Sequence, residues 1–497
     1  MLQGSHMTGA EKRGKVLAGQ LRAKKTIERM ILDSALPQFR LNKSLGRWSM
    51  IAIGVGAIIG AGIYYWAGIA AGGRIYPPAG PAVVLSFLVP LVICVLIGFC
   101  YAELASLMPL AGSVYSYSYA ALGELAAWMT GWTLVLEYGI GSVVVASAFS
   151  GELKARLADF HIFIPNRWSM PLWSEGRWTG AYFNVPAFLM VLAVTVVLSL
   201  GIRAFSRANI FMVIVKSGVI VFFIVVGSSF IQPANWHPFA PGGVRGILGA
   251  GLILFYPYIG FDCISVAAEE AKRPERDVAV GIFGSLGICA LLFMGVAVIL
   301  SGMVPYTIFS SGTAGSRVPA LYALQHFGVK PLVVGVIVAG MLTGLLSVMF
   351  VLQYGLTRLW YALSRDGLVP EVFSSLHPKT RSPHWCVWIG GAAVALLAGL
   401  IDIGEASDLV ANGVLVAFAL VSICVMSLRK SHPDHPRPFR VPWAPWLPLV
   451  ALASILMMMS ALSLSSWIRF LAWLLIGLVI YLSYGRRHST LGASVRH

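Results

Sequence analysis

Glycines interrupt an apolar stretch near the start of the chain, and the interruption is suited to binding a charged solute. The stretch Gly54-Val-Gly-Ala-Ile-Ile-Gly-Ala-Gly-Ile63 lies in an apolar run long enough to cross a bilayer. Lipid offers no hydrogen-bond partner, so a membrane helix breaks only where its freed N–H and C=O groups face protein, water or a ligand. The alternative is close helix packing through small residues. The stretch therefore predicts either half of a binding site or a tight helix contact.

Two ionisable side chains inside other apolar runs are suited to proton chemistry. Lys216 follows Arg207 by nine residues, about 13 Å along a helix. Burial disfavours the charged ammonium, so a lysine at this depth can bind and release protons, whereas the alternative is a side chain that snorkels to the interface. Glu137 lies in the middle of the third run, where it either attracts cations and carries protons or forms a structural hydrogen bond to a neighbouring helix.

The composition is that of a helical membrane protein. The chain of 497 residues is 58% hydrophobic and 11% charged, whereas an ordinary soluble domain is about 25% charged. The apolar runs are continuous, which excludes a barrel. The six cysteines lie in apolar runs without CxxC spacing, and no Walker-type loop occurs. These absences weigh against a zinc site, a disulfide framework and an ATP-driven pump.

Twelve apolar runs are near or above the roughly 20 residues needed to cross a membrane. They cover about 49–72, 81–107, 117–150, 182–201, 209–230, 246–268, 279–302, 331–362, 384–401, 409–428, 444–463 and 467–485. With a cytoplasmic N-terminus, the inner segments hold 26 of the 36 lysines and arginines, and this bias places both chain ends inside. The net charge of +16 therefore reflects the basic residues of the inner segments, and nucleic acid is not an expected partner.

The sixth run is broken like the first. In Leu254-Phe-Tyr-Pro-Tyr-Ile-Gly-Phe-Asp262, proline removes a helix donor and glycine follows three residues later. Runs one and six are five spans apart, an odd number, so the second set enters the membrane in the opposite sense. Two broken helices at matching positions of an inverted repeat indicate the substrate site of a secondary transporter.

The predicted architecture is therefore an all-α membrane protein with a five-plus-five inverted repeat and two extra C-terminal helices. Residues 1–7 look like a protease-site and cloning remnant. Residues 16–31 form either a basic amphipathic helix on the inner leaflet or a disordered tail. The predicted units are 1–48 (remnant and basic cytoplasmic tail), 49–230 (first repeat), 231–430 (second repeat), 431–485 (helices 11 and 12) and 486–497 (cytoplasmic tail).

Several motifs, in order along the chain, resemble the amino acid–polyamine–organocation superfamily, and in particular its bacterial permeases of the cationic amino acid transporter type. They are Gly56-Ala-Ile-Ile-Gly-Ala-Gly-Ile63, Tyr101-Ala-Glu103, Gly112-Ser-Val-Tyr-Ser-Tyr117, Tyr258-Ile-Gly-Phe-Asp262, Ala267-Ala-Glu-Glu270, Arg273-Pro-Glu-Arg-Asp277, Tyr354-Gly-Leu-Thr-Arg358, Leu363-Ser-Arg-Asp-Gly-Leu368 and Pro436-Arg-Pro-Phe-Arg-Val-Pro442. The resemblance implies a LeuT-like fold in the bacterial inner membrane and proton-coupled amino acid transport. It also implies that Lys216 replaces a sodium site and contacts carbonyls near Gly54.

The two helix breaks predict how the head of an amino acid is held. Amides of Gly60, Ala61 and Gly62 would bind the carboxylate at a helix N-terminus. Free carbonyls would bind the ammonium. These carbonyls would belong to Ile58, Tyr256, Pro257 and Ile259.

Two positions depart from the family pattern. Ala61 stands where relatives often carry a hydroxyl, and Pro257 is bulkier than the small residue expected there. Backbone groups read only the shared head of an amino acid, so selectivity must come from side chains, with Gln353 in helix eight as the candidate. The aromatic residues after the first break serve either as packing or interfacial-belt residues, or one of them caps the site from outside. These are Tyr64, Tyr65 and Trp66.

Charged residues near the inner helix ends predict a cytoplasmic gate, with surface ion pairing as the alternative. Glu103, Glu269 and Glu270 would be its acidic side. The basic partners would come from Arg273, Arg276 or Arg358.

The sequence thus predicts a secondary transporter that carries cationic or small neutral L-amino acids with protons by alternating access. The alternatives are a sodium-independent amino acid or polyamine exchanger and a sensor that transports nothing. No enzyme activity, metal or cofactor is expected besides the proton. The expected partners are the amino acid and the bilayer, and a small single-span subunit is left open.

Overall fold

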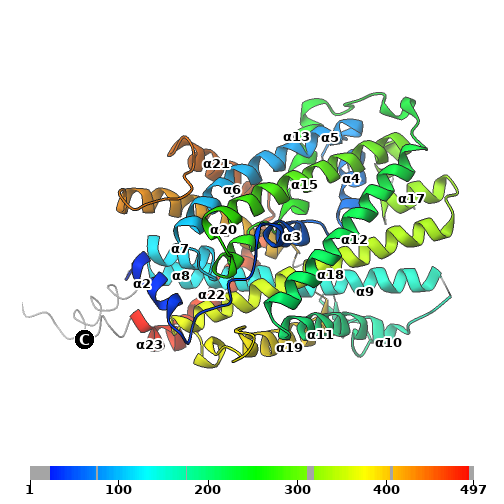
Figure 1. Ribbon diagram of the computed structural model, residues 1–497. Helices are drawn as coiled ribbons and strands as arrows, with labels where there is room; N and C mark the ends of the chain where they lie inside the picture. Colours follow the sequence, from blue (N-terminus) through cyan, green and yellow to red (C-terminus); the bar gives the residue numbers. More distant parts are fainter. Residues whose placement is uncertain are drawn as a thin grey trace, which may run out of the picture.

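Long helices run side by side through most of the chain (Figure 1). The computed structural model describes residues 23–73, 76–159, 161–174, 176–310, 318–402 and 407–491. The first half contains α2 (Ile27–Ala35), α3 (Arg47–Ile58), α4 (Ile63–Gly72), α5 (Val83–Ser86), α6 (Leu88–Leu107), α7 (Val114–Ala121), α8 (Glu124–Val135), α9 (Gly141–Asp159), α10 (Asn166–Ser169), α11 (Val185–Ser199) and α12 (Ile202–Ser228).

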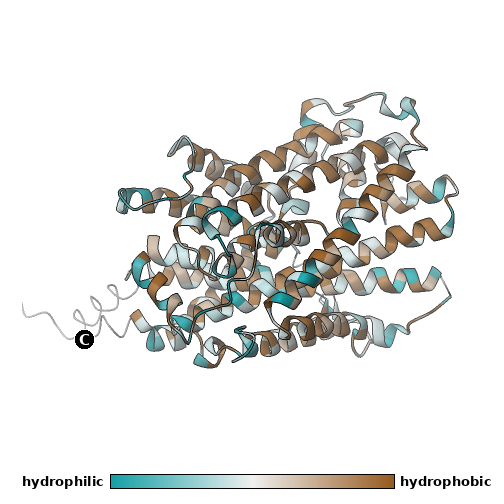
Figure 2. Ribbon diagram, in the orientation of Figure 1, coloured by the Kyte–Doolittle hydropathy of each residue, from teal (hydrophilic) through white to brown (hydrophobic). Residues whose placement is uncertain are grey.

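The second half continues the same pattern. It contains α13 (Gly243–Ile253), α14 (Cys263–Val266), η5 (Ala267–Glu270), α15 (Pro274–Met303), α16 (Thr307–Ser310), α17 (Pro319–His326), α18 (Pro331–Arg365), α19 (His384–Leu400), α20 (Ser407–Ser431), α21 (Trp446–Ser460), α22 (Leu464–Ile480) and α23 (Arg486–His488). Figure 2 shows hydrophobic residues along most of these helices and hydrophilic residues in many of the connections.

The helices match the apolar runs closely. Among the described residues, seven helices are long and apolar enough to span a membrane, and nine spans result if each of two bent pairs counts as one. Three shorter apolar helices, α11, α19 and α21, coincide with three of the remaining predicted runs. The chain is therefore an all-α membrane protein in its broad class.

Both predicted helix breaks are present. The first lies between α3 and α4, whose axes differ by 50°, and the second lies between α13 and the segment Tyr256–Glu270, where the bend is 41°. Helix α3 packs against α12, α15 and α18, so the first break is held in the centre of the bundle. The prediction of two interrupted membrane helices is confirmed.

Three details differ from the sequence prediction. The third run begins later than residue 117, because Gly123 at φ 105° separates the short helix α7 from α8. A π-helical turn at Leu136–Ile140 separates α8 from α9. The connection after α9 contains β1 (Trp173–Ser174) and β2 (Arg177–Trp178), which join β3 (Ile401–Asp402) in a small sheet of order β2-β1-β3.

Polar and charged segments gather at one end of the bundle. We call this the basic end, defined by residues 23–46, the start of α3 and the ends of α18 and α20; α2 and α23 mark it at the left of Figure 1. Helix α2 buries Ile27 and Met30 in the hydrophobic core, so this part of the tail is a helix that packs on the protein. The other tail predictions, for residues 1–22 and 492–497, lie outside the described residues.

Candidate functional site

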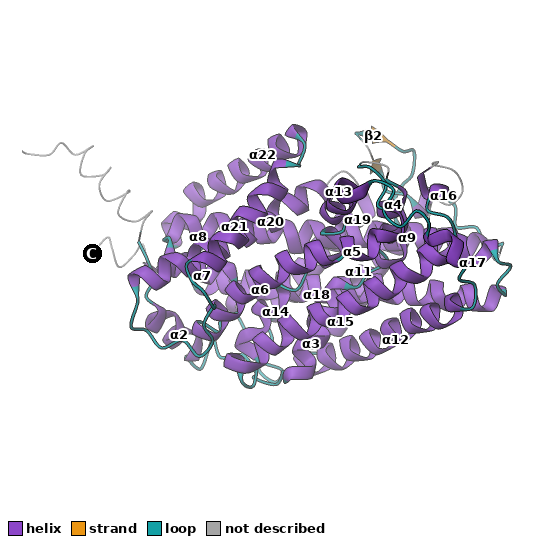
Figure 3. Ribbon diagram, turned by 90° about the horizontal axis from the view of Figure 1, so that it is seen from above, coloured by secondary structure: helices purple, strands orange, loops and turns teal. Residues whose placement is uncertain are grey.

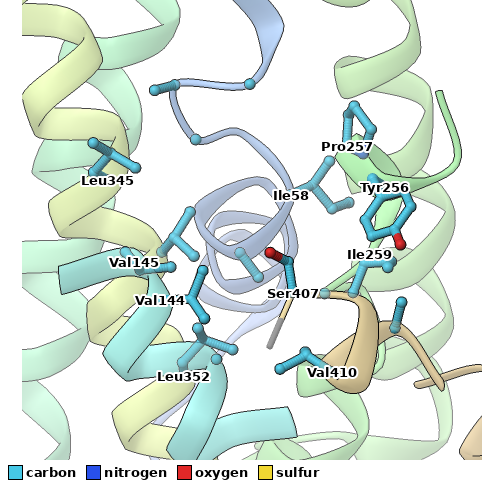
Figure 4. Close-up of a pocket in the computed structure, with 18 of the residues that line it drawn as sticks. Ile58, Val144, Val145, Tyr256, Pro257, Ile259, Leu345, Leu352, Ser407 and Val410 are labelled. Atoms are coloured by element: carbon cyan, nitrogen blue, oxygen red, sulfur yellow. The ribbon is translucent and has the colours of Figure 1, made fainter. Parts of the chain in front are cut away.

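A mostly apolar pocket of about 290 Å³ lies between the two helix breaks. Seven of the eight predicted substrate-binding residues line it: Ile58, Gly60, Ala61, Gly62, Tyr256, Pro257 and Ile259. The opposite wall comes from α9, α18 and α20, and Figure 4 shows Val144, Val145, Leu345, Leu352 and Val410 around the space that faces the breaks. The volume is just below the roughly 300–1,000 Å³ of typical small-molecule sites, which suits a solute of a few heavy atoms.

The first break leaves backbone donors and acceptors beside the pocket. Within the described part of the chain, no backbone carbonyl accepts from the amides of Gly60, Ala61 or Gly62. No backbone amide donates to the carbonyl of Ile58. Helix α4 begins at Ile63, directly after these three amides. An anion therefore meets free donors and the positive end of a helix dipole here.

The second break approaches the first through a glycine. Gly260 has φ 118°, and a Cβ at this position would lie 2.8 Å from the Cβ of Ala57. The carbonyl of Tyr256 already accepts the amide of Ile259 at 3.2 Å. The carbonyls of Pro257 and Ile259 accept from no backbone amide among the described residues, so they are better acceptors for an ammonium than that of Tyr256.

Two aromatic rings cover the pocket on the side away from the basic end. Trp66 of α4 stacks on Tyr256, with ring centroids 6.0 Å apart and 15° between the planes. Both residues line the pocket. Of the three aromatic residues considered as a cap, Trp66 is therefore the one that takes this position, whereas Tyr64 is buried against Phe223.

Lys216 contacts the first break and does not line the pocket. Its Nζ donates to the carbonyls of Gly56 (2.9 Å) and Ile59 (2.7 Å) and to Oγ of Ser347 (3.1 Å). The side chain is 1% exposed, so it does not snorkel to a surface. The carbonyls lie at the end of α3, slightly further along the chain than the predicted neighbourhood of Gly54. Lys216 thus ties α12 and α18 to the break itself.

Glu137 and Asp262 form a buried carboxyl pair. The two groups lie within interaction distance of each other and are 2% and 1% exposed. Tyr138 donates to Oδ2 of Asp262 at 2.8 Å. Among the described residues, no donor reaches Oδ1 of Asp262 or either carboxyl oxygen of Glu137. Because Glu137 lines the pocket, the pair can share a proton or meet a cation from the solute.

Gln353 is not part of the pocket. Its Oε1 accepts from Thr195 of α11 at 3.3 Å, and its side chain is buried. Adjacent residues of a helix point about 100° apart, and Leu352, one position earlier, is the residue of α18 that faces the pocket. Gln353 therefore lies outside the pocket in this arrangement, and its role in selecting the solute's side chain stays a prediction. That prediction rested on polarity alone, because the sequence does not show which face of the helix meets the pocket.

Two buried ion pairs lie at the basic end, between α18 and the end of the second broken helix. Arg358 contacts both carboxyl oxygens of Glu270 at 3.0 Å, and Tyr354 donates to the same carboxylate at 2.5 Å. Seven residues later on the same face of α18, Arg365 pairs with Glu269 at 3.0 Å. These two buried pairs join the end of the second broken helix to α18, and their role as a gate stays a prediction.

The other two predicted gate residues, Glu103 and Arg273, do not take part in these two ion pairs. Glu103 is buried but holds Arg429 (2.5 Å) and Arg437 (3.3 Å), which fastens the α20–α21 connection to α6. Arg273 is exposed, and the structure gives its guanidinium no ion pair among the described residues. Pro274 begins α15 directly after Arg273, so Arg273 lies at an exposed helix start, and its predicted role in the gate stays a prediction.

The sequence reasoning missed several residues. Three of them lie inside the motifs that resemble the superfamily, namely Asp262, Arg365 and Arg437. No spacing rule links these residues to partners far along the chain. The apolar wall residues Val144, Val145 and Leu345 carried no signal, because every membrane run is rich in such residues.

The whole chain is similar to known permeases. A family described as amino acid permease matches residues 45–483. The branched-chain amino acid permease BcaP of Bacillus subtilis is 40% identical over 96% of this chain and 100% of its own length. The methylthioribose transporter of the same organism is 38% identical over 91% of this chain and 95% of its own. The chloroplastic cationic amino acid transporter 9 of Arabidopsis thaliana is 36% identical over 78% and 67%, respectively.

Proposed function

The chain belongs to the amino acid permease family of transporters, and from this premise we propose that it imports L-amino acids with apolar, branched side chains together with protons. It would work by alternating access in the bacterial inner membrane, with twelve spans, a LeuT-like inverted repeat and both ends in the cytoplasm. The observation that carries the proposal is the pocket between the two helix breaks. Its backbone groups suit an amino acid head, and its opposite wall is mostly apolar, with Glu137 as an acidic side chain in it.

The substrate class follows from that wall. Val144, Val145, Leu345 and Leu352 offer only aliphatic surface to the solute's side chain. Burial of each methylene contributes about 0.8 kcal/mol, so a leucine, isoleucine or valine side chain would gain more there than glycine or serine would. The relative named as a branched-chain permease supports the same class.

Cationic amino acids are the second candidate, and one observation favours them. Glu137 is the acidic group in the wall of the pocket and has no donor among the described residues. If Glu137 and Asp262 shared a proton, the pair would carry one negative charge, which could attract an arginine or lysine side chain. With a second proton, the pair would be neutral and the pocket would favour apolar solutes.

Lys216 is the proposed coupling residue, with the Glu137–Asp262 pair as a second proton site. A charged Lys216 supplies the donors for the carbonyls of Gly56 and Ile59 and so holds the first break in its present shape. A neutral amine would hold them less strongly, because charge-assisted hydrogen bonds are roughly twice as strong as neutral ones. Proton loss at Lys216 would thus loosen the break on which the substrate amides depend.

Uptake into proteoliposomes tests the proposal. Labelled leucine and arginine are compared with and without an inside-alkaline pH gradient, and unlabelled methylthioribose is added as a competitor. We expect the gradient to drive leucine above its equilibrium level, with arginine transported at least about tenfold less efficiently. Uptake that requires internal amino acid and ignores the gradient would indicate an exchanger. Binding without uptake would indicate a sensor, and preferred arginine uptake would favour the second candidate.

A further inference from the structure

The segment from residue 23 to residue 46 crosses the basic end and contacts several helices of the bundle. At its start, the carbonyl of Ala23 accepts the amide of Glu124 at 3.0 Å. Further along, Tyr361 of α18 donates to the carbonyl of Phe39, and Arg381 donates to the carbonyls of Pro37 and Arg40. The segment is therefore fastened to α8, α18 and the α18–α19 connection.

Lys25 is the central contact of this segment. Its Nζ lies 2.6 Å from Asp366 at the end of α18 and 2.6 Å from Asp33 of α2. Lys25 is 3% exposed and Asp366 is 4% exposed, and Tyr115 of α7 donates to the second oxygen of Asp366 at 2.6 Å. A buried ion pair that loses one partner leaves a costly unpaired charge, so this contact strongly favours the arrangement in which it is made.

The far end of the segment binds the gate itself. The amides of Ser44 and Leu45 both donate to the carbonyl of Glu270 at 3.0 Å, and the amide of Lys272 donates to the carbonyl of Leu45 at 2.8 Å. The carboxylate of the same Glu270 holds Arg358. Helix α3 begins at Arg47, directly after these contacts. The segment thus links the first broken helix, the second broken helix and α18 at one surface.

We propose that residues 23–46 are a latch that holds the basic end closed and that Lys25 is its lock, a role that rests on the alternating-access function proposed above. For the pocket to open toward the basic end, Glu270 must separate from Arg358 and the segment Tyr256–Glu270 must move relative to α18. The latch bridges these two elements, so opening requires Lys25 to leave Asp366, or Ser44 and Leu45 to leave Glu270. A passive tether, in contrast, would keep the same contacts in both states.

A cysteine reporter between the pocket and the gate measures this opening. Ser265 of α14 is fully buried and hydrogen-bonded to Ser113, and Ser265→Cys is close to isosteric. In the full chain, this reporter is placed in wild-type, Lys25→Ala, Asp366→Asn and double-variant backgrounds. Its labelling by a membrane-impermeant maleimide is followed in inside-out vesicles, and the chain without the reporter gives the background from the native cysteines.

We expect Lys25→Ala to raise the labelling rate by at least about tenfold, because the closed state alone loses a buried partner. Asp366→Asn should raise it similarly while still accepting from Tyr115. The double variant should exceed neither single variant by more than about twofold, since both remove one interaction. Lys24→Ala is the matched control, because Lys24 is the exposed neighbouring lysine, and its rate should equal that of the wild type.

Three results would overturn the latch: a Lys25→Ala rate within twofold of the wild type, an equal rise in Lys24→Ala, or single effects that multiply in the double variant. If Lys25→Ala does not fold, the labelling rate of Asp366→Asn alone tests the latch. A raised rate supports the latch, and an unchanged rate contradicts it. A leucine-induced shift of the melting temperature is recorded for every variant. If leucine does not shift the melting temperature of the wild type, the proposed function is contradicted. If leucine shifts it and the variants are labelled at the wild-type rate, only the latch is contradicted.

Discussion

The indole of Trp66 stacks on the phenol of Tyr256, and this contact joins the two broken helices on the side of the pocket away from the basic end. The hydroxyl of Tyr256 also donates to Asp408 at 3.3 Å, which adds α20 to the same junction. On the opposite side, Arg358 and Glu270 join the second broken helix to α18. The pocket thus has an aromatic closure at one side and an ionic closure at the other. Figure 3 gives the second view of the helices that carry these contacts.

The aromatic closure should slow the release of a bound substrate. An aromatic pair contributes about 0.5–1.5 kcal/mol beyond its buried area, so we expect Trp66→Ala to raise the dissociation rate about three- to tenfold. The measurement is the washout of labelled leucine from the protein in detergent. Trp48→Ala is the control, because Trp48 is 67% exposed at the start of α3. An unchanged dissociation rate in Trp66→Ala would show that the stacked pair does not close the pocket.

Lys216→Arg should abolish proton coupling while it preserves the shape of the first helix break. Arginine keeps the positive charge and can donate to the carbonyls of Gly56 and Ile59, but it does not release its proton at any physiological pH. We therefore expect exchange of internal for external leucine to continue while gradient-driven accumulation is lost. Lys216→Ala should lose both, because the first break then lacks its donors. Accumulation by Lys216→Arg at the wild-type level would contradict a coupling role for this residue.

Of the neighbouring residues Leu352 and Gln353, only Leu352 should affect substrate selectivity. Leu352 lines the pocket, so Leu352→Ala removes apolar surface worth up to about 2 kcal/mol and should raise the KM for leucine by up to about thirtyfold. Gln353 faces Thr195 instead, so Gln353→Leu should leave the ratio of leucine to alanine uptake unchanged. Uptake rates across a series of amino acids measure both. A selectivity change in Gln353→Leu would support the sequence prediction for that residue.

The buried gate pair should matter more than the exposed charge beside it. Glu270→Gln leaves Arg358 without its anionic partner, and breaking a buried pair costs about 3–5 kcal/mol, so the melting temperature in detergent should fall by several degrees. Arg273→Gln should leave it unchanged, since Arg273 is exposed. Equal melting temperatures for Glu270→Gln and the wild type would mean that this pair contributes no net stability.

A hydroxyl at position 61 should strengthen recognition of the substrate head. Ala61 lines the pocket between two free amides, so Ala61→Ser adds a donor for the carboxylate and about 1 kcal/mol of binding energy. The Kd for leucine should fall about threefold to fivefold by titration calorimetry. Val145→Thr is the control, because it adds a hydroxyl to the apolar wall and should weaken binding. Weaker binding in Ala61→Ser would indicate that the carboxylate lies elsewhere.

The sequence alone determined the broad class and the positions of the breaks. A bilayer imposes length and composition on each span, and glycine and proline disturb the local backbone. Both effects act within one helix, so the stretch at Gly54–Ile63 and the stretch at Leu254–Asp262 could be identified without a fold. The two interpretations of the first stretch, a helix break and close helix packing, apply to different glycines. A Cβ at Gly54 would lie 2.3 Å from Oγ of Ser285, which marks close packing, whereas Gly60 and Gly62 lie in the break and line the pocket.

Only the tertiary structure decided which side chains meet. Arg358 could be named as a gate residue, but its pairing with Glu270 across 88 positions depends on how α18 lies against the end of the second broken helix. Gln353 and Leu352 are adjacent in sequence, and the rotation of α18 about its own axis decides which of them faces the pocket. In the sequence, Lys25 is one of several basic residues in the N-terminal tail, and only the structure identifies Asp366 as its partner. Partner choice is a long-range property, because it depends on the packing of whole helices and not on the residues next to each charge.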